Sequence, residues 1–177
     1  MGRKETMSSI TNKASILDDE KANILRGAVG TRACWMALIY EEACKAGIGE
    51  EGEEIIRRAV RRYGQNQGAD IKKALDDGNG SLDMEKFAQA FGSPVAVNAF
   101  EAEVTPEGEA KVDIEYHFCP LLKSWQDLGY DDETCMKLCD MAMEGDRNMA
   151  KGMGLGFELT DTIANGCPTC RMSFYKE

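Results

Sequence analysis

Hydrophobic and polar positions follow two different periods along the chain, and the period changes near residue 93. Residues 18–47 carry apolar side chains three or four positions apart behind an acidic start, which is typical of an amphipathic helix. Residues 53–75 repeat this pattern, and residues 82–91 repeat it over a shorter length. The N-terminal half of the chain is therefore predicted to be helical.

The C-terminal half alternates apolar and polar residues, which predicts strands. The expected elements are strands at 95–104 and 110–119, a short helical segment at 121–128, a longer helix beginning at 131–133, and strands at 155–163 and 169–175. The pattern predicts an α+β fold, in which a helical N-terminal half packs on an antiparallel sheet formed by two hairpin-like strand pairs around a long helix.

A chain of 177 residues suits one domain with its own core. We expect residues 1–17 to form a mobile N-terminal arm and residues 18–177 to form a single α+β domain. Within it, residues 18–92 are the helical part and residues 93–177 the strand–strand–helix–strand–strand part.

The charge balance narrows the possible partners. A net charge of −10 without a basic tail argues against binding to nucleic acid or to an anionic membrane. No apolar run reaches the length of a membrane span, and the N-terminus lacks the apolar core of a secretion signal, so we expect a cytoplasmic protein. The seven cysteines are an odd number in a chain too long to need disulfides, which favours reduced thiols that are reactive or bind a metal.

The first candidate site is the end of the strand expected at 110–119. In an extended segment His117 and Cys119 point the same way, with Cα atoms roughly 6–7 Å apart. Pro120 cannot continue the ladder, so the strand ends there and delivers an imidazole and a thiol together. An imidazolium or a helix N-terminus gives a cysteine the thiolate character that a nucleophile needs. The alternative is a half-buried histidine with an ordinary structural role.

Three further sets of residues have both a chemical and a purely structural interpretation. Cys135 and Cys139 share a helix face, which suits either a metal or core packing. Cys167 and Cys170 form a CxxC at a turn, but this motif enters a strand, which weakens a redox interpretation. A carboxylate of the Glu144-Gly145-Asp146 segment could orient His117 or act as a base, although such charges are usually solvated.

A basic ridge in the second helix is the candidate for substrate binding. Arg57, Arg58, Arg61 and Arg62 form two stacks at i,i+4 spacing. Such a ridge is either ion-paired on the surface or in a subunit interface, or it binds a substrate carboxylate.

Two C-terminal stretches carry a family resemblance, and they read HFCPLLKSWQDLGYDDETCMKLCDMAMEGDR and FELTDTIANGCPTCRMSF. Two helical stretches extend it toward the N-terminus, RACWMALIYEEACKAG and IRRAVRRYGQNQG. Over about residues 22–176 the chain resembles the L-2-amino-thiazoline-4-carboxylic acid hydrolase-like family. The most specific matches are Cys119 with Pro120, Cys139 with Asp140, and Gly166 with Cys170. Either Glu144 or Asp146 takes the place of an acidic residue that follows the Cys-Asp pair in many relatives.

This resemblance implies a hydrolase that opens a small cyclic amidine-like ring at a C–S or C–N bond, in the named case giving N-carbamoyl-cysteine. Cys119 or Cys139 is then the nucleophile, His117 or a carboxylate moves protons, and direct attack by water remains open. The candidate catalytic residues are Cys119, His117, Cys139, Asp140, Cys170, Glu144 and Asp146. The candidate substrate-binding residues are Arg57, Arg58, Arg61, Arg62, Tyr116 and Trp125.

The C-terminal half also resembles the small-molecule-binding domain of 4-vinyl reductase-type proteins. The alternative function is therefore a non-catalytic module in which cysteines line a pocket or hold a metal. The expected partner is a small molecule carrying a carboxylate, with no nucleic acid, membrane or cofactor. A homo-oligomer that hides the basic ridge is also expected.

Overall fold

The computed structural model describes residues 8–177, so residues 1–7 of the expected N-terminal arm lie outside the described residues. Within residues 8–177 the elements are α1 (Glu20–Lys45), α2 (Gly49–Ala74), α3 (Met84–Phe91), α4 (Pro94–Phe100), β1 (Ala102–Glu107), β2 (Lys111–Tyr116), α5 (Pro120–Asp127), α6 (Asp132–Met153), β3 (Gly156–Asp161), the 3-10 turn η1 (Ile163–Asn165) and β4 (Cys170–Tyr175).

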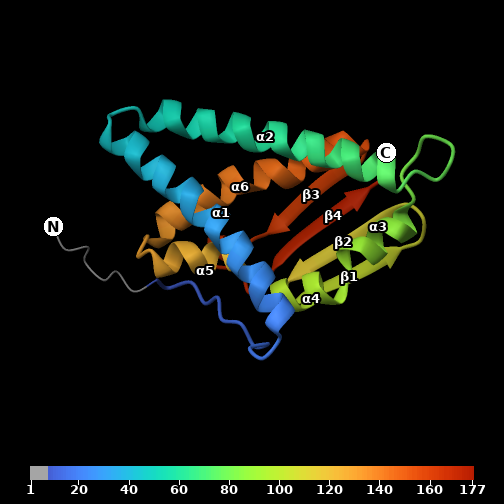
Figure 1. Ribbon diagram of the computed structural model, residues 1–177, viewed down its shortest axis with the longest axis horizontal. Coiled ribbons are helices and arrows are strands. Elements are labelled where there is room, and N and C mark those ends of the chain that lie inside the picture. The colour runs from blue at the N-terminus through green and yellow to red at the C-terminus, as the bar shows by residue number, and fades with distance from the viewer. Residues whose placement is uncertain (1–7) are drawn as a thin grey trace.

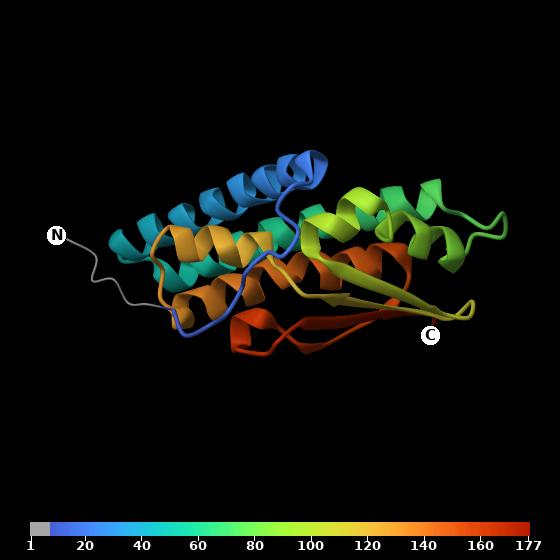
Figure 2. The same ribbon diagram turned by 90° about the horizontal axis from the view of Figure 1, so that it is seen from below.

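The strands of the described chain form one antiparallel sheet in the order β1-β2-β4-β3. All the helices lie on one side of this sheet, and Figure 2 shows α6 between α2 and the sheet (Figures 1 and 2). Within residues 8–177, no helix covers the opposite face of the sheet. The α+β prediction is confirmed, since helices and an antiparallel sheet pack together as separate layers.

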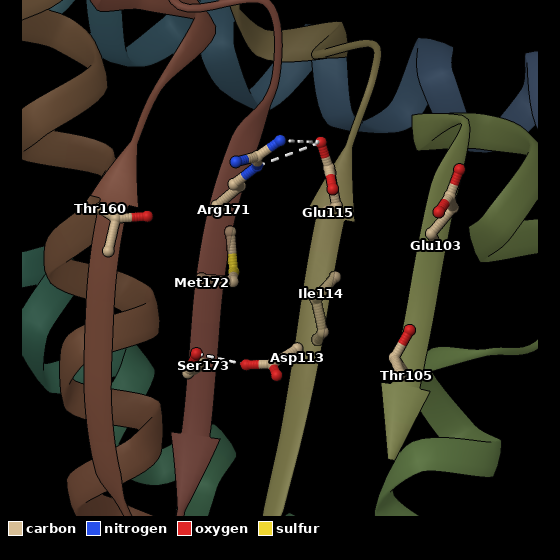
Figure 3. A pocket seen from close by; sticks show the side chains of 9 residues that line it. All are labelled: Glu103, Thr105, Asp113, Ile114, Glu115, Thr160, Arg171, Met172 and Ser173. Carbon is tan, nitrogen blue, oxygen red and sulfur yellow. Dashed lines mark hydrogen bonds and ion pairs between the residues drawn. The ribbon is translucent and has the colours of Figure 1, made fainter. Parts of the chain in front are cut away.

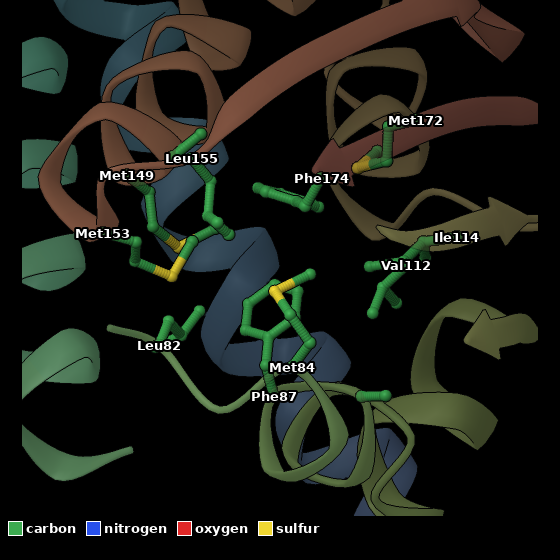
Figure 4. Packing of buried hydrophobic residues seen from close by; sticks show 12 residues of the cluster. Leu82, Met84, Phe87, Val112, Ile114, Met149, Met153, Leu155, Met172 and Phe174 are labelled. Atoms are coloured by element: carbon green, nitrogen blue, oxygen red, sulfur yellow. The ribbon is translucent and has the colours of Figure 1, made fainter. Parts of the chain in front are cut away.

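An aromatic core fills the space between the sheet, α3 and the end of α6 (Figure 4). The Phe174 ring of β4 lies 5.2 Å from the Phe87 ring of α3 and 5.1 Å from the Phe157 ring of β3, measured between centroids. Phe87 and Phe174 are fully buried, and Met153 and Leu155 close the space beside them. Full burial of each side chain of this size contributes about 1.5–3 kcal/mol, so this cluster holds the sheet against the helices.

Glycines allow α2 and α6 to run side by side, in the same direction, at backbone contact (Figure 1). A Cβ added at Gly64 would stand 2.3 Å from the carbonyl oxygen of Gly145. A Cβ added at Gly68 would stand 2.1 Å from the carbonyl oxygen of Met149 and 2.9 Å from the Cα of Gly152. No other residue fits at such distances, so the small side chains fix how close the two helices lie.

The prediction of a strand at 95–104 is wrong for the first part of this segment, because residues 94–100 form α4. Ser93 precedes Pro94 at the first helical position, where the missing N–H and fixed φ of proline fit a helix. Glu101 then ends the helix with a left-handed φ of 50°. Its carboxylate lies 3.2 Å from Arg26 of α1, so tertiary contacts stabilise a turn that alternation alone could not predict.

The strand expected at 110–119 ends earlier, at Tyr116. The N–H groups of His117 and Phe118 donate to backbone carbonyls just before β1, and Cys119 is already the N-cap of α5. The alternation of faces therefore stops before Cys119, which changes the candidate site.

The outer face of α1 carries large exposed apolar side chains, among them Trp35, which is 71% exposed, and Ile39, which is 56% exposed. Within residues 8–177, no helix combines the length and the apolar character that crossing a bilayer requires. The expected homo-oligomer stays a prediction.

Replacing Gly64 by Ala is expected to lower the free energy of unfolding by about 2 kcal/mol or more, because the new Cβ meets a backbone oxygen of α6 that cannot move aside. Gly27→Ala is the matched control, since this helical glycine of α1 has nothing within 4 Å of an added Cβ. The free energy of unfolding of this control should rise by about 0.5–1 kcal/mol, because alanine has a higher helix propensity than glycine. Urea unfolding measures the free energy of unfolding of both variants. If both values change in the same direction, the close approach of α2 and α6 is contradicted.

Candidate active site

Three predicted cysteines and one predicted carboxylate come together on the helical side of the sheet. Cys119 stands at the start of α5, Cys170 at the start of β4, and Cys139 and Asp146 on α6. These four residues, called the thiol–carboxylate cluster below, are close enough for the charges of Asp146 and the other thiols to raise the pKa of Cys139. The residues of the cluster were predicted as site residues, whereas their chemical roles stay predictions.

Local structure explains why these side chains meet. Tyr116 is the last residue of β2, and its register partner in β4 is Cys170. Cys119 follows three residues later, so β2 brings it beside Cys170. Cys139 and Asp146 are seven residues apart, which is about two turns of α6, so they share one helix face.

The Cys119 sulfur caps α5. Its Sγ accepts a hydrogen bond from the Leu122 N–H at 3.5 Å, the place that a serine or aspartate oxygen takes in many helices. Burial raises the pKa of the Cys119 thiol, while the N–H groups of Leu122 and Leu121 act to lower it. The helix start therefore offsets part of the cost of a buried thiolate.

Burial also holds the other two thiols of the cluster neutral. Burial raises the pKa of Cys170 to about 12, although its Sγ accepts a hydrogen bond from the Ile163 N–H at 3.3 Å. Burial also raises the pKa of Cys139, with Cys119 and Cys170 as the next causes. Because Cys119 alone of the three lies on a helix N-terminus, it is the best placed to form a thiolate.

Asp146 is the titratable carboxyl of the cluster. Burial raises its pKa from 3.8 to about 6, even though the positive charge of Arg32 acts in the opposite direction. Within residues 8–177, no side chain donates a hydrogen bond to this carboxylate. A carboxyl with a pKa near neutrality and some remaining solvent contact can both accept and return a proton.

Arg32 on α1 is a residue that the sequence analysis missed. Its side chain is exposed and forms no ion pair or hydrogen bond within the described chain, yet its charge reaches Asp146. The available signal was an arginine among the apolar positions of the first helix, in a stretch that also carries the family resemblance.

His117 lies on the other side of the sheet. Its Nε2 is 3.3 Å from the Glu103 carboxylate, and it is one of the neighbours that lower the pKa of Glu115. The expectation that His117 and Cys119 point the same way is wrong, because the strand ends at Tyr116 and the chain turns into α5 between the two residues.

The uncovered face of the sheet contains a hollow of about 210 Å³ (Figure 3). Its charged groups are already paired, since Glu115 accepts from Thr169 at 2.7 Å and from Arg171 at 3.2 Å. Asp113 likewise accepts from Ser173. No cysteine lines this hollow, so it is separate from the thiol–carboxylate cluster.

The basic ridge is mostly ion-paired along the edge between α2 and α6. Arg57 lies 2.8 Å from Glu53 and 2.7 Å from Asp140, while Arg61 lies 2.6 Å from Glu144. Asp140 and Glu144 therefore belong to this network, which Arg147 extends. Arg58 and Arg62 are exposed and form no ion pair within residues 8–177.

The two aromatic candidates differ in position. Trp125 is buried, and its Nε1 donates to the carbonyl of Ala33 at 3.0 Å, so it joins α5 to α1. Tyr116 is partly exposed beside the cluster, and burial together with the Asp146 charge raises its pKa.

Two further cysteines lie outside the cluster. Cys135 is fully buried, and the Cys167 thiol donates a 3.6 Å hydrogen bond to Asp161. Among residues 8–177, no three His, Cys, Asp or Glu side chains are arranged to hold a metal ion.

Fold and site define a class, namely a small α+β protein with thiols and one carboxyl between its sheet and its long helix. The family is more specific: residues 28–174 match the family model described as L-2-amino-thiazoline-4-carboxylic acid hydrolase, and the chain belongs to this family. The resemblance seen in the sequence is confirmed, and the family carries the name of a hydrolase. A search of curated proteins gives no significant match.

Replacing Asp146 by Asn is expected to stabilise the fold at neutral pH. A carboxyl whose pKa rises on folding from 3.8 to about 6 contributes stability below about pH 4, and this contribution is lost as pH rises through about 6. Ionisation of the buried Asp146 therefore lowers the free energy of unfolding by at most about 3 kcal/mol at pH 7. The amide of the Asn variant does not ionise, so this loss is absent. Urea unfolding across pH should therefore show a gain in the free energy of unfolding that grows between about pH 4 and about pH 6 and levels off by about pH 7. A gain independent of pH would contradict this assignment.

Proposed function

We propose that the protein is a hydrolase that opens the ring of L-2-amino-thiazoline-4-carboxylate or of a closely related cyclic amidine. One observation carries this proposal. The Cys119 sulfur caps the N-terminus of α5 and lies near Asp146, a carboxyl whose pKa is raised to about 6. Family membership supports the same reaction class.

The substrate has one electron-poor carbon, bonded to the ring sulfur and to two nitrogens. Hydrolysis adds the oxygen of water to this carbon and breaks its bond to the ring sulfur. The sulfur leaves as a thiol after gaining a proton, and the product is N-carbamoyl-cysteine. The protein must therefore supply a nucleophile, a group that moves protons and a contact that orients the ring.

Two routes use the same residues. In the covalent route Asp146 accepts the Cys119 proton, the thiolate adds to the carbon, and the proton passes to the leaving sulfur. Water then releases the carbamoyl product from Cys119. In the direct route Asp146 removes a proton from water, which attacks the carbon, and Cys119 only contacts the substrate. The capped position of Cys119 favours the covalent route.

Arg32 is the residue that we propose to bind the substrate carboxylate. Its guanidinium has no ion-pair or hydrogen-bond partner within residues 8–177, so it can form two parallel hydrogen bonds to a carboxylate. Its proximity to Asp146 would orient the ring toward the thiol–carboxylate cluster. The earlier candidates Arg57 and Arg61 already have carboxylate partners, which makes them less available.

Replacing Cys119 by Ser is expected to lower kcat for ring opening by about 100-fold or more, because a hydroxyl is a far weaker nucleophile near neutral pH. Steady-state assays with L-2-amino-thiazoline-4-carboxylate measure this, and Cys44→Ser is the matched control, since Cys44 is exposed on α1. Full activity of the Cys119 variant would exclude the covalent route. Tight substrate binding by the wild-type protein without turnover would instead favour the non-catalytic module.

Replacing Arg32 by Met is expected to raise KM for the carboxylate substrate by about 10-fold to 100-fold, since a charge-assisted hydrogen bond is worth about 1.5–3 kcal/mol. An analogue without the carboxylate should bind the variant and the wild type equally well. Arg58→Met is the control on the basic ridge. If the Arg58 variant alone raises KM, the substrate carboxylate binds at the ridge instead.

A further inference from the structure

The segment before α1 is tied to the domain at both ends. We call residues 8–17 the N-terminal strap. Near its start, the Ser8 and Ser9 hydroxyls donate to the Asp132 carboxylate of α6, both at 2.6 Å. Near its end, the N–H groups of Ser15 and Ile16 donate to Glu101 at 2.6 Å and 2.9 Å. The strap therefore runs from the start of α6, past the start of α5, to the turn between α4 and β1 (Figure 2).

Asn12, in the middle of the strap, contacts Cys119 through both halves of its amide. Its Nδ2 donates to the Cys119 carbonyl at 2.9 Å, and its Oδ1 accepts from the Cys119 N–H at 2.9 Å. Asn12 is only 6% exposed, whereas its neighbours Thr11 and Lys13 are exposed. A buried amide that satisfies both backbone groups of one residue fixes the φ and ψ of that residue.

The conformation of Cys119 decides where its sulfur lies. With φ at −119° and ψ at 107°, the residue is extended, as an N-cap must be for its side chain to reach the first free N–H groups of the helix. Without the two Asn12 contacts, the Cys119 N–H would lack its partner, and the sulfur could turn away from α5.

We propose that Asn12 is a positioning residue that keeps the Cys119 sulfur on the N-terminus of α5 by holding its backbone. The proposal rests on the proposed function of Cys119 as the nucleophile, and it adds one residue of the N-terminal strap, Asn12, to those that shape the active site. Asn12 lies outside residues 28–174, which match the family model, so this contact comes from a segment beyond the matched region.

The test is the rate at which iodoacetamide alkylates Cys119, followed by peptide mass spectrometry across pH. Asn12→Ala should slow this alkylation on the order of fivefold to tenfold near pH 7, the size of a lost helix cap, and should shift its pH midpoint upward. In the turnover assay kcat should fall while KM stays unchanged, because Asn12 does not contact the substrate.

Two controls separate positioning from general anchoring of the strap. Lys13→Ala changes an exposed neighbour, and Ser15→Ala removes the 2.7 Å hydroxyl contact to Glu101 at the far end of the strap. Both variants should react with iodoacetamide as the wild type does. If Ser15→Ala slows alkylation as much as Asn12→Ala, or if Asn12→Ala leaves the rate and the pH midpoint unchanged or increases the rate, the proposal is overturned.

If Asn12→Ala does not fold, Asn12→Asp replaces it in the same assay. The carboxylate still accepts from the Cys119 N–H but cannot donate to its carbonyl, so slower alkylation is again expected and an unchanged rate overturns the proposal. Alkylation needs no substrate. A failure of the proposed function would appear as full turnover by Cys119→Ser, while the effect of Asn12 on the thiol would still be measured.

Discussion

The backbone contact between α2 and α6 is the constraint on which the rest of the structure depends. Gly64 and Gly68 bring α2 against Gly145 and Gly152, so one side of α6 is fixed by contacts that no larger residue permits. Asp146 follows Gly145 directly and therefore points about 100° further around α6, toward the sheet and α5. The same helix thus packs by its glycines on one side and presents a thiol and a carboxyl on another, with ion pairs along the edge between them.

Desolvation dominates the electrostatics of the cluster. Burial is the largest cause of the raised pKa of Asp146 and of all three thiols, and nearby acidic groups add to it at the thiols. Opposing it are the N–H groups of α5 at Cys119 and the charge of Arg32 at Asp146. The Ile163 N–H opposes burial in the same way at Cys170, whereas every cause that acts on Cys139 raises the pKa of that thiol.

The sequence predicted the fold class and the long helices, because amphipathic periods are local properties. It also named the four residues that the structure brings together in the thiol–carboxylate cluster, and their role as a site stays a prediction. It could not predict α4, since Ser93 and Pro94 also fit the end of the preceding helix, and tertiary contacts of Glu101 decide the outcome. It paired His117 with Cys119 because the rule of alternating faces was extended past Tyr116, where the strand ends.

The long-range contacts of the candidate site could not be predicted from any local sequence pattern. Asn12 and Cys119 are 107 residues apart in the sequence, and the link between them is one side-chain amide matched to one peptide. Such a match leaves no periodic trace, and a polar segment before the first helix is ordinarily expected to be mobile. The burial of Asn12 distinguishes this contact from the exposed hydrogen bonds near it, because an amide removed from water must be fully paired to be tolerated. The N-terminal strap is therefore held most specifically at the residue that contacts the candidate nucleophile.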